Sequence, residues 1–176
     1  MKTSILVLVM LAGVPAFAQN GIKDALAKHW KTSADFTVAV AKAMPAESYN
    51  FRPNPEEMNF GQVMAHIAAA NVSACSRASG LPRPALNDKS AAWIKDTKTD
   101  VDRDTAIQFL NDAFTFCATA ISGITPEKLS AMTGPEGRQM SGFEILWAYF
   151  THTAHHRGQA EVYLRVKGIK PPDYVF

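Results

Sequence analysis

The sequence has almost no excess of charge of either sign. Eighteen Lys and Arg residues stand against 16 Asp and Glu residues, which gives a formal net charge of +2 at pH 7 over 176 residues. Proteins that bind nucleic acid or an anionic membrane surface through charge carry a marked basic excess or a basic cluster. We therefore expect neither nucleic acid nor a membrane as a partner of the folded domain.

The N-terminal apolar run is too short to cross a membrane. It covers residues 5–14, whereas a membrane-spanning helix needs about 20 apolar residues. Lys2 precedes the run, and the small residues Ala16 and Ala18 follow it, which is the pattern of a secretory signal peptide. We expect residues 1–18 to be removed, so that residues 19–176 form an exported protein, periplasmic or secreted.

Cysteine is scarce, with two residues in the whole chain, Cys75 and Cys117. Export would permit a disulfide between them. Because a disulfide needs a specific geometry that the sequence does not supply, a bridge between two helices and a pair of buried free thiols both stay open. A catalytic thiol is not expected, since no cationic residue lies nearby in sequence to lower its pKa.

The chain also lacks strand-like alternation, internal repeats and low-complexity segments. Four segments instead have the apolar spacing of helices: residues 21–44, 60–79, 104–121 and 141–167. The proline-rich segment 81–102 is too long for a tight turn between the second and third helices. We therefore predict an all-α fold, a single four-helix bundle over residues 19–176 with a long crossover connection between helices 2 and 3.

The last predicted helix carries a polar stripe with a metal-binding spacing. His152 and His156 are four residues apart, so their side chains differ by about 40° around the helix and can reach one ion. Gln159 and Tyr163 lie within about 20° of His152 by the same geometry. His155 lies about 60° to the other side, which suits a hydrogen-bonding role near the site rather than a ligand role.

His66 is the expected third ligand, from the second predicted helix. Alanines surround it, and small side chains let two helices approach closely or leave space for water and substrate. Neutral imidazoles bind Zn²⁺, Ni²⁺ or Fe²⁺, and three protein ligands leave a position open on the ion. The zincin motif is absent, because Thr153 rather than Glu follows His152.

The rest of the last predicted helix is strongly apolar. This composition predicts that much of its circumference is buried, and the residues concerned are Phe143, Leu146, Trp147, Phe150, Val162 and Leu164. Gly158 costs a helix interior up to about 1 kcal/mol relative to Ala, so we also expect another helix to pack closely against it. Glu144 reads as a capping-box residue with Ser141, and Glu161 as a solvated charge.

Residues 43–53, residues 60–67 and the element His152-x-x-x-His156-Arg157-Gly158-Gln159 resemble the DinB family, the DinB/YfiT-like metalloenzymes. The likeness extends over almost the whole predicted mature chain. It implies a four-helix bundle with a crossover, and a metal held by three histidines that fall on His66, His152 and His156. Homodimers are frequent among similar proteins, so a homodimer is an expectation from the resemblance.

Related members transfer small thiols such as bacillithiol or mycothiol, or isomerise substrates with their help. Such thiols are kept reduced in the cytoplasm, so an exported protein is better suited to hydrolysis of a small-molecule substrate by metal-activated water. Gln159, His155 and Tyr163 would then orient the water or the substrate. A thiol-dependent transferase and a non-catalytic exported bundle that binds metal or a small ligand are the alternatives.

Overall fold

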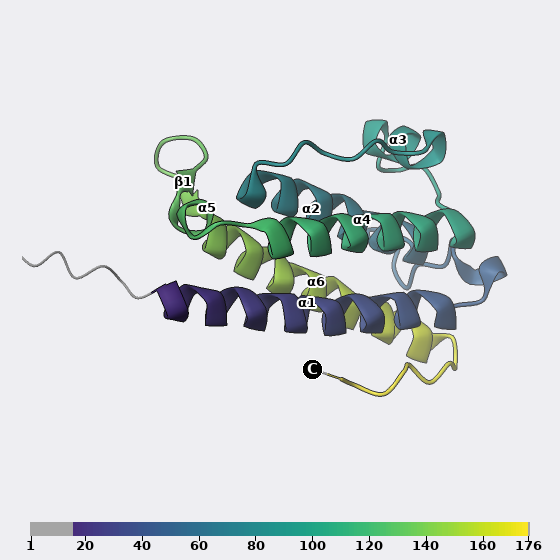
Figure 1. Ribbon diagram of the computed structural model, residues 1–176. Helices are drawn as coiled ribbons and strands as arrows, with labels where there is room; N and C mark the ends of the chain where they lie inside the picture. Colours follow the sequence, from purple (N-terminus) through teal and green to yellow (C-terminus); the bar gives the residue numbers. More distant parts are fainter. Residues whose placement is uncertain (1–15, 176) are drawn as a thin grey trace, which may run out of the picture.

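The computed structural model describes residues 16–175, with side chains from residue 21 onward (Figure 1). The predicted signal peptide, residues 1–18, lies almost entirely outside the described residues. Within the described part of the chain, no helix is both long enough and apolar enough to cross a membrane.

Four long helices make up most of the molecule: α1 (Ala16–Ala43), α2 (Phe60–Ser79), α4 (Arg103–Gly123) and α6 (Gly142–Val166). Helix α2 packs against α4 and α6, and α1 packs against the same two helices. Figure 1 shows that α1 and α6 run in one direction, whereas α2 and α4 run in the other. The prediction of an all-α fold is confirmed.

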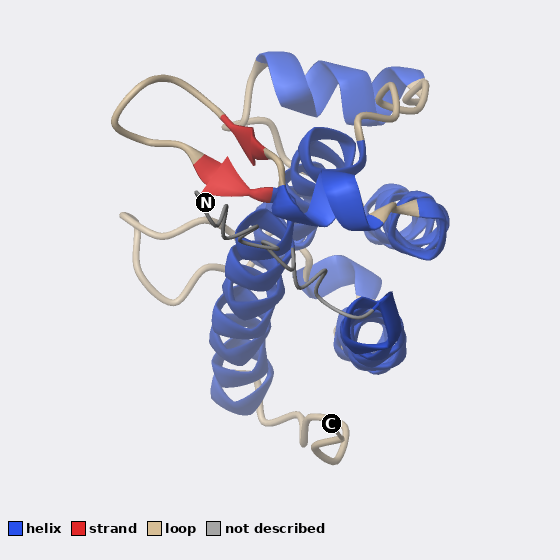
Figure 2. Ribbon diagram, turned by 60° about the vertical axis from the view of Figure 1, so that its left-hand side comes forward, coloured by secondary structure: helices blue, strands red, loops and turns tan. Residues whose placement is uncertain are grey.

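The described residues contain more elements than the sequence pattern predicts. The additional elements are short: η1 (Ala46–Ser48), α3 (Asp88–Lys95), α5 (Pro126–Ser130), β1 (Met132–Thr133) and β2 (Met140–Ser141). Strands β1 and β2 form a minimal antiparallel hairpin directly before α6 (Figure 2). The expectation of four helices and no strand was therefore incomplete, because it missed two helices of eight and five residues and strands of two residues.

The start of α2 is tied to the segment that leads into α4. Asn59 caps α2 in a reciprocal pair with Gln62, which satisfies backbone N–H groups at the helix start. The Gln62 side chain also donates to the carbonyl of Lys98 at 2.7 Å, and the Asn59 amide donates to Asp100 at 2.6 Å. These bonds hold the end of the long connection against the helix that carries His66.

Part of the apolar surface of α6 is not buried. Leu146 and Leu164 lie in the core, but Phe143, Trp147 and Val162 are 38%, 55% and 53% exposed. The prediction that these three are buried was wrong, because α1, α2 and the short α5 cover only part of the circumference of α6.

Gly158 does not mark a close contact between helices. A Cβ atom built at this position would meet no atom within 4 Å. The prediction of close packing there was wrong. Gly61 is the glycine of α2 where a close approach does occur, because a Cβ there would collide with the carbonyl oxygen of Val101. That contact packs the start of α2 against the residues just before α4.

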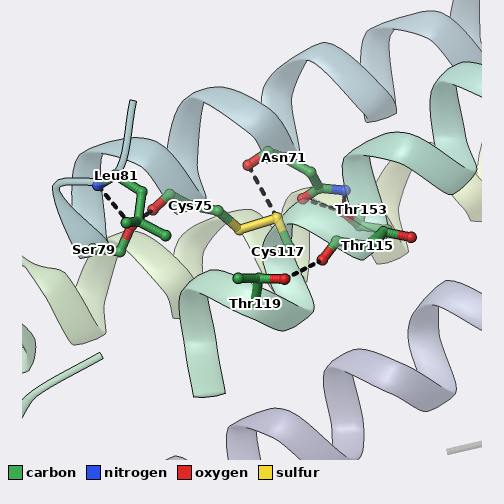
Figure 3. Close-up of a disulfide and its surroundings, with 8 residues drawn as sticks. All are labelled: Asn71, Cys75, Ser79, Leu81, Thr115, Cys117, Thr119 and Thr153. Carbon is green, nitrogen blue, oxygen red and sulfur yellow. Dashed lines mark hydrogen bonds between the residues drawn. A yellow bond between two sulfur atoms is a disulfide. The ribbon is translucent and has the colours of Figure 1, made fainter. Parts of the chain in front are cut away.

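The two cysteines form a disulfide (Figure 3). Cys75 of α2 and Cys117 of α4 are both fully buried, with Cα atoms 5.3 Å apart. The alternative of two free thiols is thereby excluded. The bridge joins two long helices that run in the same direction and closes a sequence separation of 42 residues.

Candidate metal centre

The structure brings His66, His152 and His156 together. The Nε2 atom of His152 lies 3.1 Å from Nε2 of His66 and 3.1 Å from Nε2 of His156. One candidate ligand atom from each of the three residues lies within 4.8 Å of the other two. The three predicted ligands thus converge from α2 and α6, although His66 and His152 are 86 residues apart in sequence.

A buried pair of polar side chains next to the histidines aligns α2 with α6. The Asn71 amide donates to the Thr153 hydroxyl at 3.0 Å, and the hydroxyl donates to the amide oxygen at 3.1 Å (Figure 3 shows both residues). Thr153 directly follows His152, and Asn71 lies five residues beyond His66, about one and a half helical turns. The pair therefore fixes the relative position of the two helices beside the ligands.

The three nitrogens fit a shared cation better than they fit one another. A ring nitrogen of neutral imidazole carries either one hydrogen or one lone pair, so it makes one strong hydrogen bond. The Nε2 atom of His152 nevertheless has two nitrogen neighbours at 3.1 Å. A cation that accepts all three lone pairs resolves this conflict, and nitrogens on a tetrahedral Zn²⁺ lie roughly 3.4 Å apart. The donor set thus fits a divalent ion.

The local electrostatics keep the imidazoles neutral. Burial, followed by the neighbouring rings of His156, His66 and His155, lowers the pKa of His152 to about 4. Burial and the charge of His156 also lower the pKa of His66. At neutral pH these rings consequently offer lone pairs rather than protons, as metal ligands require.

Gln159 is positioned to select the tautomer of His156. The Nδ1 atom of His156 lies 2.7 Å from Oε1 of Gln159, and an amide oxygen can only accept, so Nδ1 carries the hydrogen and Nε2 the lone pair. Burial lowers the pKa of His156, while this hydrogen bond raises it. Such a partner of a ligand histidine orients the ring and tunes its basicity.

The other two residues proposed from the sequence make different contacts. His155 is exposed, its ring centroid lies 4.9 Å from that of His156, and its Nε2 lies 3.3 Å from Nε2 of Gln159. Tyr163 is buried, and its hydroxyl donates to the carbonyl of Met58 at 3.0 Å. Catalytic roles for Gln159, His155 and Tyr163 stay predictions.

His152 lacks the second hydrogen bond that His156 has. Its Nδ1 atom is buried, and no other described residue offers it a hydrogen-bond partner. The ring of Tyr149 lies beside it, with centroids 5.5 Å apart. The orientation of His152 is therefore set by ring packing and by its helix rather than by a hydrogen bond to Nδ1.

Among the described residues, the cluster that could hold a metal contains histidines and no carboxylate. Glu144 accepts from the backbone N–H of Ser141 at 2.7 Å, so it caps α6, as its position predicted. Glu161 lies 3.7 Å from Arg165 and 4.0 Å from Arg157. An ion held by three neutral ligands would keep its full charge, which favours Lewis acidity.

Asn71 and Thr153 are the residues near the site that the sequence pattern did not indicate. The available signal was weak: Asn71 is an amide in an otherwise small and apolar stretch of α2, and it is fully buried. A buried amide needs hydrogen-bond partners, but the sequence does not say which helix supplies them.

Comparison with known proteins points to one family. A family model described as the DinB superfamily matches residues 29–160. A crystal structure of a DinB-like protein from Bacillus cereus has a TM-score of 0.70 at 21% identity and covers 86% of this chain and 97% of its own. A DinB-like protein from Bacillus subtilis has a TM-score of 0.67 at 18% identity, covering 85% and 96%. No curated protein matches the chain.

Proposed function

The chain belongs to the DinB superfamily, and we propose that it is a metal-dependent enzyme whose ion is held by His66, His152 and His156. The observation that carries this proposal is the convergence of three Nε2 atoms from two helices. A structural zinc site has four protein ligands, whereas a catalytic site has three and keeps one position open. The ligand number thus favours catalysis over a purely structural ion.

The reaction that we propose is hydrolysis of a small-molecule substrate. His66, His152 and His156 would hold a divalent ion, Zn²⁺, Ni²⁺ or Fe²⁺, which when bound would lower the pKa of water and polarise a substrate oxygen. Gln159 would hold His156 in the tautomer that presents Nε2. His155, exposed beside Gln159, would hydrogen-bond the substrate or the water. Tyr163 is the weakest candidate of the three, since its hydroxyl is already bonded to Met58.

We further propose that the protein is exported after loss of residues 1–18. The disulfide between Cys75 and Cys117 supports this location, because such bonds persist in oxidising compartments. An oxidising compartment also disfavours a reduced thiol cofactor, so hydrolysis is preferred to thiol transfer. We interpret α1, α2, α4 and α6 as one four-helix bundle whose crossover is the segment between α2 and α4.

Metal analysis tests the site. We expect protein purified without chelators to hold about one equivalent of a divalent metal, as one three-ligand site implies. The variant His156→Ala should lose most of it, because two imidazoles remain. His29→Ala is the matched control, since His29 lies on α1 outside the cluster, and it should keep the metal. Full metal content in His156→Ala would refute the assignment of the ligands.

An activity panel then tests the reaction. Wild-type protein should hydrolyse at least one class of ester, amide or phosphate substrate, and His156→Ala should not. In the cobalt-substituted protein, azide should change the visible spectrum, because an open position on the ion accepts it. An unchanged spectrum would favour the structural alternative, and thiol transfer without hydrolysis would favour the transferase alternative.

A further inference from the structure

A cavity lies between α1 and α6, on the other side of α6 from the three candidate ligand histidines. His152 and His156 face α2, whereas Arg157 faces α1, where it contacts Ser33. The cavity has a volume of about 470 Å³, which is within the range of small-molecule sites. Its walls are mostly apolar, and the large apolar side chains that line it include Ile22, Leu26, Phe143, Trp147 and Phe150.

The rim of this cavity collects much of the exposed apolar surface. The described residues include ten exposed large hydrophobic side chains, and five of them border the cavity: Ile22, Phe143, Trp147, Tyr174 and Val175. Single exposed hydrophobic residues are ordinary, but a cluster of them around a hollow indicates a binding surface. Trp147 and Tyr174 are the most exposed of the five, at 55% and 72%.

The cavity also contains a buried cation. The Arg157 side chain lines it and is only 7% exposed. Its Nη1 atom donates to the Ser33 hydroxyl at 3.0 Å, and its guanidinium carbon lies 4.5 Å from the centre of the Phe36 ring. Its Nε atom is buried and has no hydrogen-bond partner among the described residues. A buried guanidinium without a hydrogen-bonded carboxylate favours an anionic partner.

The charge that this cation can balance is limited. Glu161 lies 4.0 Å from the Arg157 Nε atom, too far for a hydrogen bond but close enough to offset part of the positive charge. A dianion such as a phosphate monoester would therefore add repulsion from Glu161. A group with one negative charge suits the site better, and a planar carboxylate matches the guanidinium geometry.

We propose that this cavity binds an amphipathic monocarboxylate, with its apolar chain between Trp147 and the start of α1 and its carboxylate at Arg157. The proposal does not depend on the metal centre. The apolar walls supply affinity by removing ligand surface from water, and Arg157 supplies selectivity for the anion.

The probe is dodecanoate, kept below the concentration at which it forms micelles, with dodecanol as the uncharged analogue. Titration is followed by calorimetry in the presence of a chelator, because a carboxylate could otherwise bind an ion at the histidines. We expect saturable binding of dodecanoate and at least about tenfold weaker binding of dodecanol, since a charge-assisted hydrogen bond is lost. Equal binding of the two, or no saturable binding, would overturn the proposal.

Two variants locate the site. Trp147→Ala removes an exposed side chain at the rim and should weaken dodecanoate binding about tenfold without unfolding the protein. Val162→Ala is the matched control on α6, equally exposed but outside the cavity, and should bind as the wild type does. If both variants bind like the wild type, dodecanoate binds elsewhere and the proposal fails.

Two substitutions test whether the charge of Arg157 selects the carboxylate. Arg157→Gln should bring dodecanoate binding down to that of dodecanol, and Arg157→Lys should retain part of the preference. Circular dichroism tests whether each variant is folded. If Arg157→Gln does not fold, the result for Trp147→Ala decides whether dodecanoate binds in this cavity. A concentration-dependent dimer that Trp147→Ala dissociates and dodecanoate does not would show that a second copy of the chain covers this face, and would also overturn the proposal.

Discussion

At the scale of single residues, Gln159 has the clearest link to the candidate metal centre. Its Oε1 atom accepts from Nδ1 of His156 at 2.7 Å, which leaves Nε2 of that ring free to bind an ion. The sequence suggested Gln159 by its helical phase, and its contact indicates a positioning residue that acts through His156. Loss of such a contact usually weakens metal binding by about ten- to a hundredfold.

We therefore expect Gln159→Ala to bind its metal about ten- to a hundredfold more weakly than the wild type. Competition with a coloured chelator measures this affinity. Gln159→Glu keeps an acceptor at the same place and should restore most of the affinity. Equal affinities for the wild type and Gln159→Ala would show that the hydrogen bond to His156 does not contribute to the site.

At the scale of helices and their connections, the contact between Asn71 and Thr153 sets how α2 meets α6. Both side chains are buried, and each bonds the other in both directions. The valine side chain has nearly the shape of threonine but no hydroxyl, so Thr153→Val leaves the Asn71 amide without its partner. An unsatisfied buried polar group costs about 1–3 kcal/mol.

We predict that Thr153→Val lowers the free energy of unfolding by about 1–3 kcal/mol, measured by urea denaturation. Thr151→Val is the control, because Thr151 is exposed on the same helix and bonds only to the carbonyl of Ala148. Its effect should stay within about 0.5 kcal/mol. Similar losses in both variants would mean that the valine disturbs α6 itself rather than its contact with α2.

The start of α4 predicts a pH effect. Asp102 caps this helix by accepting from the Thr105 N–H at 2.9 Å, and Lys89 of α3 donates to its other oxygen at 2.9 Å. The hydrogen bond from Lys89, followed by that from Thr105, lowers the pKa of Asp102 from 3.8 to about 2. The folded-state pKa lies below the unfolded one, so the carboxylate stabilises the fold above about pH 4 and loses this effect towards pH 2.

Asp102→Ala should therefore lower the free energy of unfolding at pH 7 by about 0.5–2 kcal/mol, the usual range for a helix cap. The difference from the wild type should shrink as the pH falls from about 4 to about 2. Urea titrations at several pH values measure both effects. Asp173→Ala removes an exposed carboxylate from the C-terminal tail and should change little at any pH. If the difference in the free energy of unfolding between Asp102→Ala and the wild type grew as the pH fell, the role assigned to the Asp102 carboxylate would be wrong.

The long helices could be predicted from the sequence because the apolar periodicity and the capping residues that indicate them are local. The predicted bounds of α2 match the structure, and those of α6 differ by one residue at each end. Helices α3 and α5 were missed because eight and five residues are too few for an apolar period to stand out. Their starts did carry a signal, since Asn87 and Thr125 are capping residues and Pro126 occupies the first turn of α5.

The candidate site could likewise be predicted where its signals are local. The pairing of His152 with His156 follows from helical spacing alone, and an alanine-rich setting singled out His66. The contact of Asn71 with Thr153 could not be predicted, because it joins residues 82 positions apart. The exposure of Trp147 could not be predicted either, since it depends on which side of α6 the other helices leave uncovered.

At the scale of the whole molecule, the disulfide is the covalent link between long helices. Cys75 and Cys117 close a loop of about 42 residues, and a chain-entropy estimate for a loop of this size is roughly 4 kcal/mol. The measured effect of removing a native disulfide from a small domain is typically about 2–5 kcal/mol. Both sulfur atoms are buried, so their replacement also changes the packing between α2 and α4.

We predict that the double variant Cys75→Ala/Cys117→Ala loses about 2–5 kcal/mol in guanidinium denaturation. The single variant Cys75→Ala is the control, because it removes the bridge and leaves the Cys117 side chain in place. It should lose nearly as much as the double variant. An unchanged midpoint in either variant would show that the bridge does not constrain the unfolded chain.

In the sequence, both cysteines of the disulfide lie between His66 and His152. His66 and His152 meet across 86 residues, and the whole segment from Cys75 to Cys117 lies between them. When an ion is bound, the chain thus carries two nested cross-links, an inner one that is permanent in an oxidising compartment and an outer one that depends on ion supply and acidity. Its resistance to unfolding would then report how much metal the surroundings hold.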